Sequence, residues 1–215
     1  MPRATQRPAA MHLPPPRPGR GRSLAESLRR RRTTREISDR KLSPQLFSNL
    51  LWAACGTNRR KGPFGYGGLT AASASNSQEI DVYLALADGA HRFDARLHRL
   101  IPVVAGDLRP LALGLGQRAG VETKAPVELV YVADVHRLTH TRGFQEPGLH
   151  DPEVQKSYYY VDTGLIASNV YLFAASQRLA CWFHNCDRVA LARRLKLRRE
   201  QRVLFAQSVG YPQGA

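Results

Sequence analysis

The apolar positions of the chain follow two periods, one typical of strands and one typical of helices. Apolar side chains occupy every second position from 80 to 86, which is the period of a half-buried strand. The run 127–135 is largely apolar and predicts a central strand, because a strand that is buried on both faces loses its alternation. Further strands are expected at 91–93, 99–104 and 203–209.

Helical signals begin at Ser23, which has Glu26 three positions later, the spacing of a capping box. Ser43 is a good N-cap, and Pro44 suits the first turn of a second helix that ends before Gly56. Further helices are expected over 107–119, 165–173 and 188–197.

Three stretches have neither period. The glycine-rich stretch 58–69 predicts a mobile loop, and the polar stretch 136–156 predicts a loop that serves as a lid. Residues 1–22 are rich in Pro and Arg and have too few apolar side chains for a core, so we expect a disordered or extended arm. The order of elements lacks the steady alternation of a doubly wound sheet. It predicts an α+β fold in a single domain over 23–215.

The formal net charge of +15 is concentrated near the two ends of the chain. Residues 1–42 hold twelve of the 32 Lys and Arg residues, and 188–202 hold seven more. The chain lacks the aromatic interleaving of a single-strand binder and the spacing of helix-turn-helix or zinc-finger motifs, so we do not expect specific nucleic-acid binding. The basic excess favours an anionic cofactor.

The cysteines and the hydropathy of the chain indicate in which compartment the protein is expected. Cys55, Cys181 and Cys186 form no disulfide framework and predict a reducing compartment, with the cytoplasm as the default. No apolar run approaches the roughly 20 residues that cross a bilayer, so no membrane association is expected. His184 lies between two of the cysteines, but the spacing and the lack of a fourth ligand argue against a metal site.

Two polar segments carry the candidate chemistry. The run Arg31-Arg32-Thr33-Thr34-Arg35 offers forked guanidiniums and hydroxyl donors, which suit a phosphate dianion. The run Ser73-Ala74-Ser75-Asn76-Ser77-Gln78 groups small hydroxyls around an amide that can read both edges of a planar heterocycle. Together they predict a phosphate-bearing cofactor such as FMN. Taken singly, the first run also fits a solvated helix end, and the second fits a plain loop.

These segments, in this order, resemble the nitroreductase family, FMN proteins that work as homodimers. The resemblance covers about residues 13–212 and also rests on Asp162-Thr163-Gly164 at the opening of the long helix and Val209-Gly210-Tyr211-Pro212 at the closing strand. It implies a nitroreductase-like α+β fold with a central, mainly antiparallel sheet flanked by helices. It also implies a dimer joined through long interface helices.

Within the family, the chain is most similar to the SagB-type branch, dehydrogenases that oxidise the thiazolines and oxazolines of peptides to aromatic rings. The similarity lies in Leu13-Pro14-Pro15-Pro16 and in the stretches 51–59 and 88–94. The stretch 72–79 departs from the branch and is closer to the general family pattern. His184-Asn185 stands where many members have Gly-Gly beside the reactive edge of the flavin. Side chains at these two positions would narrow the access of a substrate to the flavin. Many relatives also have a further basic phosphate contact after the closing strand, and this sequence has none there.

The resemblance implies a phosphate site on Arg31, Thr33 and Arg35, and a flavin ring at the subunit interface near Asn76. No catalytic residue is fixed, and the candidates are His184, Lys156 and Tyr158. His184 is either a donor near the flavin or a plain loop residue, and the tyrosines at 158–160 either line the substrate site or belong to the core. The implied cofactor-binding set is Arg31, Arg32, Thr33, Arg35, Ser73, Ala74, Asn76, His184 and Asn185.

The implied activity is hydride transfer between NAD(P)H, or an organic substrate, and an acceptor, with a small molecule or a peptide as substrate. The sequence does not distinguish NADH from NADPH, since it has no nicotinamide fingerprint. Two other functions stay open. The His184-Asn185 replacement and the short C-terminus favour a flavin-binding protein that has lost catalysis, and the charge alone favours a polyanion partner.

Overall fold

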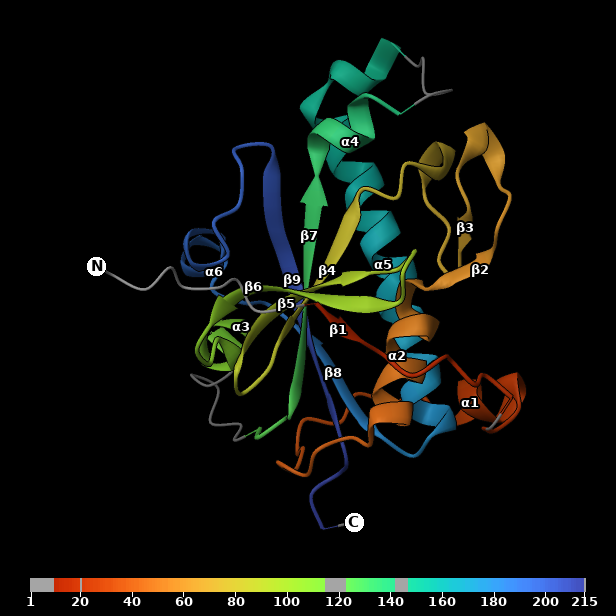
Figure 1. Cartoon of the computed structure of the whole chain (residues 1–215), viewed down its shortest axis with the longest axis vertical. Coiled ribbons are helices and arrows are strands. Elements are labelled where there is room, and N and C mark those ends of the chain that lie inside the picture. Colours follow the sequence, from red (N-terminus) through yellow and green to blue (C-terminus); the bar gives the residue numbers. More distant parts are fainter. Residues whose placement is uncertain (1–9, 20, 115–122, 142–146, 215) are drawn as a thin grey trace.

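The computed structural model describes residues 10–19, 21–114, 123–141 and 147–214. Its strands are β1 (Met11–His12), β2 (Thr57–Arg59), β3 (Gly68–Leu69), β4 (Ile80–Ala85), β5 (Gly89–Asp94), β6 (Arg99–Ala105), β7 (Val127–Asp134), β8 (Ala180–His184) and β9 (Gln201–Gly210). Seven of them form one sheet in the order β1-β6-β5-β4-β7-β9-β8, with every neighbouring pair antiparallel (Figure 1). The other two, β2 and β3, form a separate hairpin.

The helices are α1 (Leu24–Arg30), α2 (Pro44–Cys55), α3 (Arg109–Leu113), α4 (Val135–Thr139), α5 (Pro152–Ser176) and α6 (Arg188–Arg194). Short 3₁₀ turns are η1 (Pro63–Gly65), η2 (Ala74–Asn76) and η4 (Pro147–His150). None of the helices within the described ranges is both long enough and apolar enough to span a membrane.

Helices cover both faces of the central sheet. The long helix α5 crosses one face with α2 and α1 beside it, and α3 and α6 lie on the other face (Figure 1). Because side chains alternate along a strand, Leu129 and Tyr131 of β7 pack on the α5 face, whereas Val130 and Val132 pack on the α6 face. All four are at most 1% exposed, and burying each such side chain stabilises the fold by roughly 1.5–3 kcal/mol.

The structure confirms the α+β fold and most of the predicted elements. The strands expected at 80–86, 91–93, 99–104, 127–135 and 203–209 are β4, β5, β6, β7 and β9. Both predicted N-caps are also present, because Ser23 Oγ accepts from the Glu26 N–H at 3.2 Å and Ser43 Oγ accepts from the Leu46 N–H at 3.3 Å.

The loop that was predicted over 136–156 is wrong for 136–139 and 152–156, which are helical. Residues 135–139 form α4, and α5 begins at Pro152, well before the predicted start at 165. Asp151 caps α5 by accepting from the Glu153 N–H at 2.8 Å, and Pro152 has the backbone angle of a first helical turn. Polar residues on the solvent side of this first part of α5 gave the false loop signal. Residues 142–146 lie outside the described ranges.

Other boundaries also differ from the prediction. The stretch 58–69 contains the hairpin strands β2 and β3 and the turn η1, rather than an open loop throughout. The helix expected over 107–119 is α3, which ends at Leu113, and 115–122 lie outside the described residues. Strand β8 has no counterpart among the predicted elements, and it ends at His184, for which a loop position was one expectation.

The described part of the N-terminal arm is extended and attached to the fold. Strand β1 pairs with β6, and the hydroxyl of Ser48 on α2 donates to the Pro14 carbonyl at 2.5 Å. The side-chain amide of Gln45 donates to the Pro15 carbonyl at 2.9 Å. Residues 1–9 are not described, and the assignment of 23–215 to a single domain stays a prediction.

A pair of buried carboxyl groups ties the Ser73–Gln78 segment to α5. Asp162 Oδ2 on α5 accepts from the Ala74 N–H at 2.9 Å, and Ser77 Oγ donates to Glu79 Oε2 at 2.6 Å. Burial and the neighbouring Asp162 raise the pKa of Glu79 from its ordinary 4.5 to about 7. Glu79 therefore keeps its proton in the folded protein at a pH where the unfolded chain would release it.

Glu79→Gln should remove part of the pH dependence of stability. Because the folded pKa is raised, the stabilising contribution of protonated Glu79 is complete below about pH 4.5 and is lost as the pH rises through about 7. The uncharged amide of Gln avoids that loss. We expect the variant to gain on the order of 1–3 kcal/mol in free energy of unfolding relative to wild type between pH 5 and pH 8.5.

The measurement is urea unfolding of both proteins across this pH range. Glu200→Gln, at an exposed position, is the matched control and should keep the wild-type profile. A constant difference between Glu79→Gln and wild type at every pH would contradict the assignment.

Candidate functional site

The Arg31–Arg35 segment lies along the open edge of the central sheet. Strand β8 has β9 on one side only, so its outer backbone groups need partners from elsewhere. The Thr34 N–H donates to the Cys181 carbonyl at 2.9 Å, and farther along the segment Ile37 forms a bridge with Pro212. These contacts turn a run that could have been a solvated helix end into an extended segment with a fixed position.

Tyr171 of α5 joins this segment to the sheet edge. The Phe183 N–H donates to Tyr171 Oη at 2.9 Å, and the same oxygen shares a hydrogen bond with Thr33 Oγ1 at 3.1 Å. The guanidinium of Arg31 lies over the Tyr171 ring, 5.4 Å from its centroid, in a cation–π contact. The structure thus brings Arg31 and Thr33 to one tyrosine.

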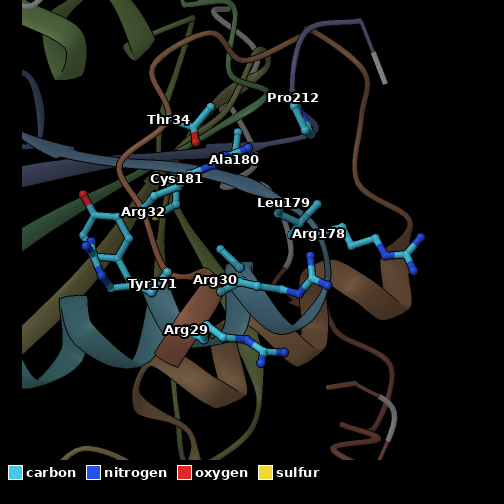
Figure 2. Close-up of a pocket in the computed structure, with 13 residues that line it drawn as sticks. Arg29, Arg30, Arg32, Thr34, Tyr171, Arg178, Leu179, Ala180, Cys181 and Pro212 are labelled. Atoms are coloured by element: carbon cyan, nitrogen blue, oxygen red, sulfur yellow. The ribbon is translucent and has the colours of Figure 1, made fainter. Parts of the chain in front are cut away.

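A cavity of about 520 Å³ opens beside this contact, between the ends of α1 and α5 and the start of β8 (Figure 2). This volume falls within the usual range of ligand pockets. Among the described residues that line it, none is Asp or Glu. The lining residues are Arg29, Arg30, Arg31, Arg32, Thr34, Tyr171, Ala174, Ala175, Arg178, Leu179, Ala180, Cys181 and Pro212.

The electrostatics of this arginine cavity favour an anion. Cations near a helix C-terminus are stabilised by the helix dipole, which explains part of the clustering at the end of α1. Five guanidiniums around one cavity nevertheless repel each other. A bound phosphate would offset that repulsion and accept forked hydrogen bonds from arginine.

Arg35 is directed elsewhere. Its guanidinium lies 5.5 Å from the centroid of the Trp182 ring, and Trp182 in turn packs against His184 at 4.4 Å between centroids. Trp182 and His184 share the face of β8 that is opposite to Phe183. The structure therefore separates Arg35 from the contact that Arg31 and Thr33 make with Tyr171.

His184 does not lie in a loop, and its side chain is buried. It ends β8, is 7% exposed, and its Nε2 lies 2.8 Å from Ser208 Oγ. Ser208 Oγ also donates to Glu128, and His184 Nδ1 faces the Asn185 carbonyl at 2.9 Å. Burial raises the pKa of Glu128, and the adjacent His184 partly offsets the rise. The expectation that the His184 side chain narrows access to the flavin stays a prediction.

Asn185, the next residue, is exposed, and its Oδ1 accepts from Arg188 Nη2 at 3.3 Å. Of His184 and Asn185, only Asn185 thus presents its side chain to solvent.

The Ser73–Asn76 motif forms a strained turn. Ser75 and Asn76 have positive φ angles of 47° and 54°, a left-handed conformation that L-residues adopt at a cost. Ser73 Oγ accepts from the Gln78 N–H at 2.9 Å, and Ala74 is held by Asp162 as described above. Because Asp162 precedes Tyr171 by nine residues on α5, the turn and the arginine cavity are about 13 Å apart along the helix. The structure does not join the two motifs within one chain.

The other catalytic candidates lie farther away. Lys156 and Tyr158 belong to the first turns of α5, and Lys156 is about 22 Å along the helix from Tyr171. Lys156 is exposed and forms an ion pair with Glu153. Of the neighbouring tyrosines, Tyr159 is buried in the core, whereas Tyr160 is 39% exposed.

An aromatic shelf on the α5 face was missed by the sequence analysis. The rings of Phe183 on β8 and Phe205 on β9 are 4.8 Å apart, and Tyr160 lies 5.8 Å from Phe205. The guanidinium of Arg188 covers Phe205 at 5.2 Å. Such a surface suits a planar conjugated ring. Of these residues only Tyr160 was a candidate from the sequence. Phe183, Phe205 and Tyr171 had no sequence signal, because they come from separate elements that meet only in the fold.

No group of three or more His, Cys, Asp or Glu residues in the described part of the chain could hold a metal ion. Burial raises the pKa of all three cysteine thiols, so Cys55, Cys181 and Cys186 are core residues rather than reactive thiolates.

Comparison with known proteins agrees with this architecture. The family model "Nitroreductase family" matches residues 28–211. A candidate nitroreductase from Ralstonia eutropha has a crystal structure that superposes with a TM-score of 0.81 at 30% identity, over 99% of this chain and 93% of the other. No curated protein sequence matches the chain at a significant level.

Two more distant structures share the fold. One is the Escherichia coli microcin synthetase McbBCD complex with truncated pro-MccB17 bound, with a TM-score of 0.63 at 16% identity, over 81% of this chain and 66% of the other. The other is the NADPH:FMN oxidoreductase of Vibrio harveyi complexed with NAD⁺. It has a TM-score of 0.57 at 19% identity, over 88% of this chain and 69% of the other. With the family match across most of its length, the chain belongs to the nitroreductase family of FMN-dependent oxidoreductases.

Proposed function

We propose that the protein transfers hydride between NAD(P)H, or an organic substrate, and an acceptor, with FMN bound in part by the arginine cavity. The observation that carries the proposal is a cavity lined by five arginines and, among its described residues, by no carboxylate. A phosphate monoester matches this donor set, since it brings up to two negative charges and several acceptor oxygens. When bound, FMN supplies the two-electron redox chemistry.

The residues of the chain have distinct tasks in this proposal. Arg31 and Thr33 contact the phosphate, and Tyr171 orients Thr33 through the 3.1 Å hydrogen bond between their hydroxyls. The shelf of Phe183 and Phe205 receives a planar ring of the cofactor or the substrate. His184 is a positioning residue, because it is buried against Ser208 and faces the Asn185 carbonyl.

The active form is proposed to be a homodimer in which the two motifs come from different subunits. The arginine cavity and the Ser73–Asn76 turn lie toward opposite ends of α5. If two α5 helices pair in antiparallel orientation, the turn of one subunit approaches the cavity of the other. This arrangement explains why the binding motifs are separated within one chain.

The exposed face of α5 supports this dimer. Val161 is 61% exposed and Leu165 is 41% exposed, four positions apart on the same side of the helix. Gly164 and Ser168 are exposed beside them, and such small residues allow a close approach of a second helix. Exposed apolar side chains grouped in this way commonly mark a protein interface.

A second candidate function is the oxidation of thiazolines or oxazolines in a peptide, as in the SagB-type branch. It is favoured by the structural similarity to the microcin synthetase complex, which contains a bound peptide, and by the Leu13–Pro16 segment. That segment packs along α2, where the Pro14 carbonyl accepts from Ser48. The proposed location is the cytoplasm, which agrees with three unpaired, buried cysteines.

Purified protein should bind FMN, and Arg31→Gln should weaken that binding. Losing one charge-assisted hydrogen bond to phosphate costs roughly 1.5–3 kcal/mol, so the Kd should rise at least tenfold. The measurement is the quenching of flavin fluorescence. Arg193→Gln, an exposed arginine on α6, is the matched control and should leave the Kd unchanged. A wild-type protein that takes up no FMN would refute the proposed cofactor site.

The visible spectrum of the FMN-loaded protein should separate the candidate activities. Under anaerobic conditions, bleaching by NADPH or NADH indicates a reductase, because the pyridine nucleotide then donates to the flavin. Bleaching by a thiazoline-containing peptide, but by neither nucleotide, indicates the dehydrogenase. Yellow protein that no donor bleaches would contradict both and favour a flavin-binding protein without catalysis.

Leu165→Glu should separate the proposed dimer into monomers. A carboxylate at this position would be desolvated in a helix–helix interface, which is strongly unfavourable. Sedimentation should give twice the 24.0 kDa chain mass for wild type and a single chain mass for the variant. Val189→Glu, at a 73% exposed apolar position on α6, is the control and should remain dimeric. Wild type that sediments as a monomer would rule out this arrangement.

A further inference from the structure

The hairpin of β2 and β3 has a tip that the proposed function does not use. The hairpin stands apart from the central sheet (Figure 1), and its turn η1 (Pro63–Gly65) packs against η2 (Ala74–Asn76). The side-chain amide of Gln78 donates to the Gly67 carbonyl at 2.7 Å and to Asn76 Oδ1 at 3.0 Å. The tip is therefore held beside the motif that the proposed function places near the flavin ring.

Two cations of this hairpin have no charge partner. Arg60 and Lys61 are exposed, and neither forms an ion pair with a carboxylate in the described part of the chain. Arg59 is folded back instead. Its Nη1 donates to Asn58 Oδ1 at 3.0 Å, and its guanidinium lies so close to Gly68 that an added Cβ would meet the Cζ atom at 2.1 Å. Arg60 and Lys61 thus remain available to a ligand that enters from solvent.

Exposed aromatic rings lie on the same tip. Phe64 is 46% exposed and Tyr66 is 39% exposed. The guanidinium of Arg96 lies 5.5 Å from the centroid of the Tyr66 ring, in a cation–π contact that covers part of it. An added Cβ on Gly62 would lie 2.6 Å from the Tyr66 carbonyl oxygen, so the two arms of the tip are in close contact. The cations and the rings therefore form one small surface.

This combination indicates a more specific ligand than charge alone. Solvated cations are common on protein surfaces and indicate no ligand by themselves. Here they lie beside an exposed phenyl ring, on a segment that hydrogen bonds fix next to Asn76. An aromatic ring with an anionic substituent matches both features, because the ring stacks on the phenyl group and the anion pairs with the cations.

We propose that the tip of the β2–β3 hairpin selects a planar aromatic substrate that carries a negative charge, such as a carboxylate or a sulfonate. Arg60 and Lys61 pair with the charged group, and Phe64 packs against the ring. The inference rests on the proposed function, which places the flavin ring near Asn76. It adds the substrate class to that function, since an anionic aromatic compound is preferred to a neutral compound of the same shape.

The test compares para-nitrobenzoate with para-nitrobenzamide on the FMN-loaded protein. The two compounds share their ring and nitro group and differ in charge, and isothermal titration calorimetry measures their affinities without turnover. Wild type should bind the nitrobenzoate roughly five- to tenfold more tightly, because each exposed ion pair contributes little by itself. This preference should shrink as the salt concentration rises, since salt screens exposed charges.

The double variant Arg60→Gln/Lys61→Gln should bring the two affinities to within about twofold of each other, because it removes both cations. Arg193→Gln/Lys196→Gln is the matched control. It removes the same charge from exposed positions at and just after the end of α6, and it should keep the wild-type preference.

Phe64→Asn tests the ring contact separately. The backbone at Phe64 has a φ of 59°, a left-handed conformation that Asn adopts more readily than Phe, so the variant keeps the turn. Both compounds have the same ring, and we expect both affinities to fall about threefold while their ratio stays at the wild-type value. A change in the ratio alone would contradict the stacking contact.

The proposal is overturned if wild type binds the two compounds equally or binds neither. It is also overturned if the hairpin double variant folds and keeps the wild-type ratio. A thermal unfolding curve checks folding, and Arg60→Gln alone, which should lower the ratio by about half, keeps the test decisive if the double variant fails to fold. Wild type that takes up FMN without this preference defeats only the role of the hairpin. Wild type that takes up no FMN defeats the proposed function as well.

Discussion

The open edge of β8 is the constraint on which the candidate site depends. An edge strand leaves backbone groups without partners, and here the segment after α1 supplies one of them when the Thr34 N–H donates to the Cys181 carbonyl. Tyr171 supplies another by accepting from the Phe183 N–H. Satisfying the sheet edge therefore fixes the arginine run against α5. The geometry of the anion cavity is a consequence of backbone hydrogen bonding, and the guanidiniums then give it its chemistry.

The same arrangement explains why so much positive charge is tolerated near one end of the molecule. Arginine side chains at the C-terminal ends of α1 and α5 gain a little from the helix dipoles, and one of them, Arg30, also pairs with Glu26. These contacts balance only part of the charge. The remaining guanidiniums surround the cavity, which is where the proposed function places the phosphate of FMN. In that proposal a small phosphate ligand, rather than a polyanion partner, accounts for this part of the positive charge.

Buried polar groups fix one segment on each face of the central sheet. On one side, Glu79 and Asp162 hold the Ser73–Gln78 turn, and Asp162 does so directly through the Ala74 N–H. On the opposite face of the sheet, Glu128 and Ser208 hold His184. Such groups are costly to bury unless they are hydrogen-bonded, so both clusters favour one conformation of the neighbouring chain. His184 is thereby held with its Nδ1 2.9 Å from the carbonyl of Asn185.

The sequence by itself determined the period of the main strands, the caps at Ser23 and Ser43, and the two motifs that indicated a phosphate-bearing cofactor. These features are local, since a cap or an alternation depends only on residues a few positions apart. The sequence failed to predict β8, because five residues are too few to show a period. It also failed to predict the start of α5, because the exposed polar surface of a helix resembles a loop in sequence. Only the tertiary structure decided that Arg31 and Thr33 meet Tyr171, that Arg35 turns away to Trp182, and that the two motifs contact α5 about nine residues apart. Those outcomes depend on which elements pack together, and contacts between residues more than a hundred positions apart leave no local pattern in the chain.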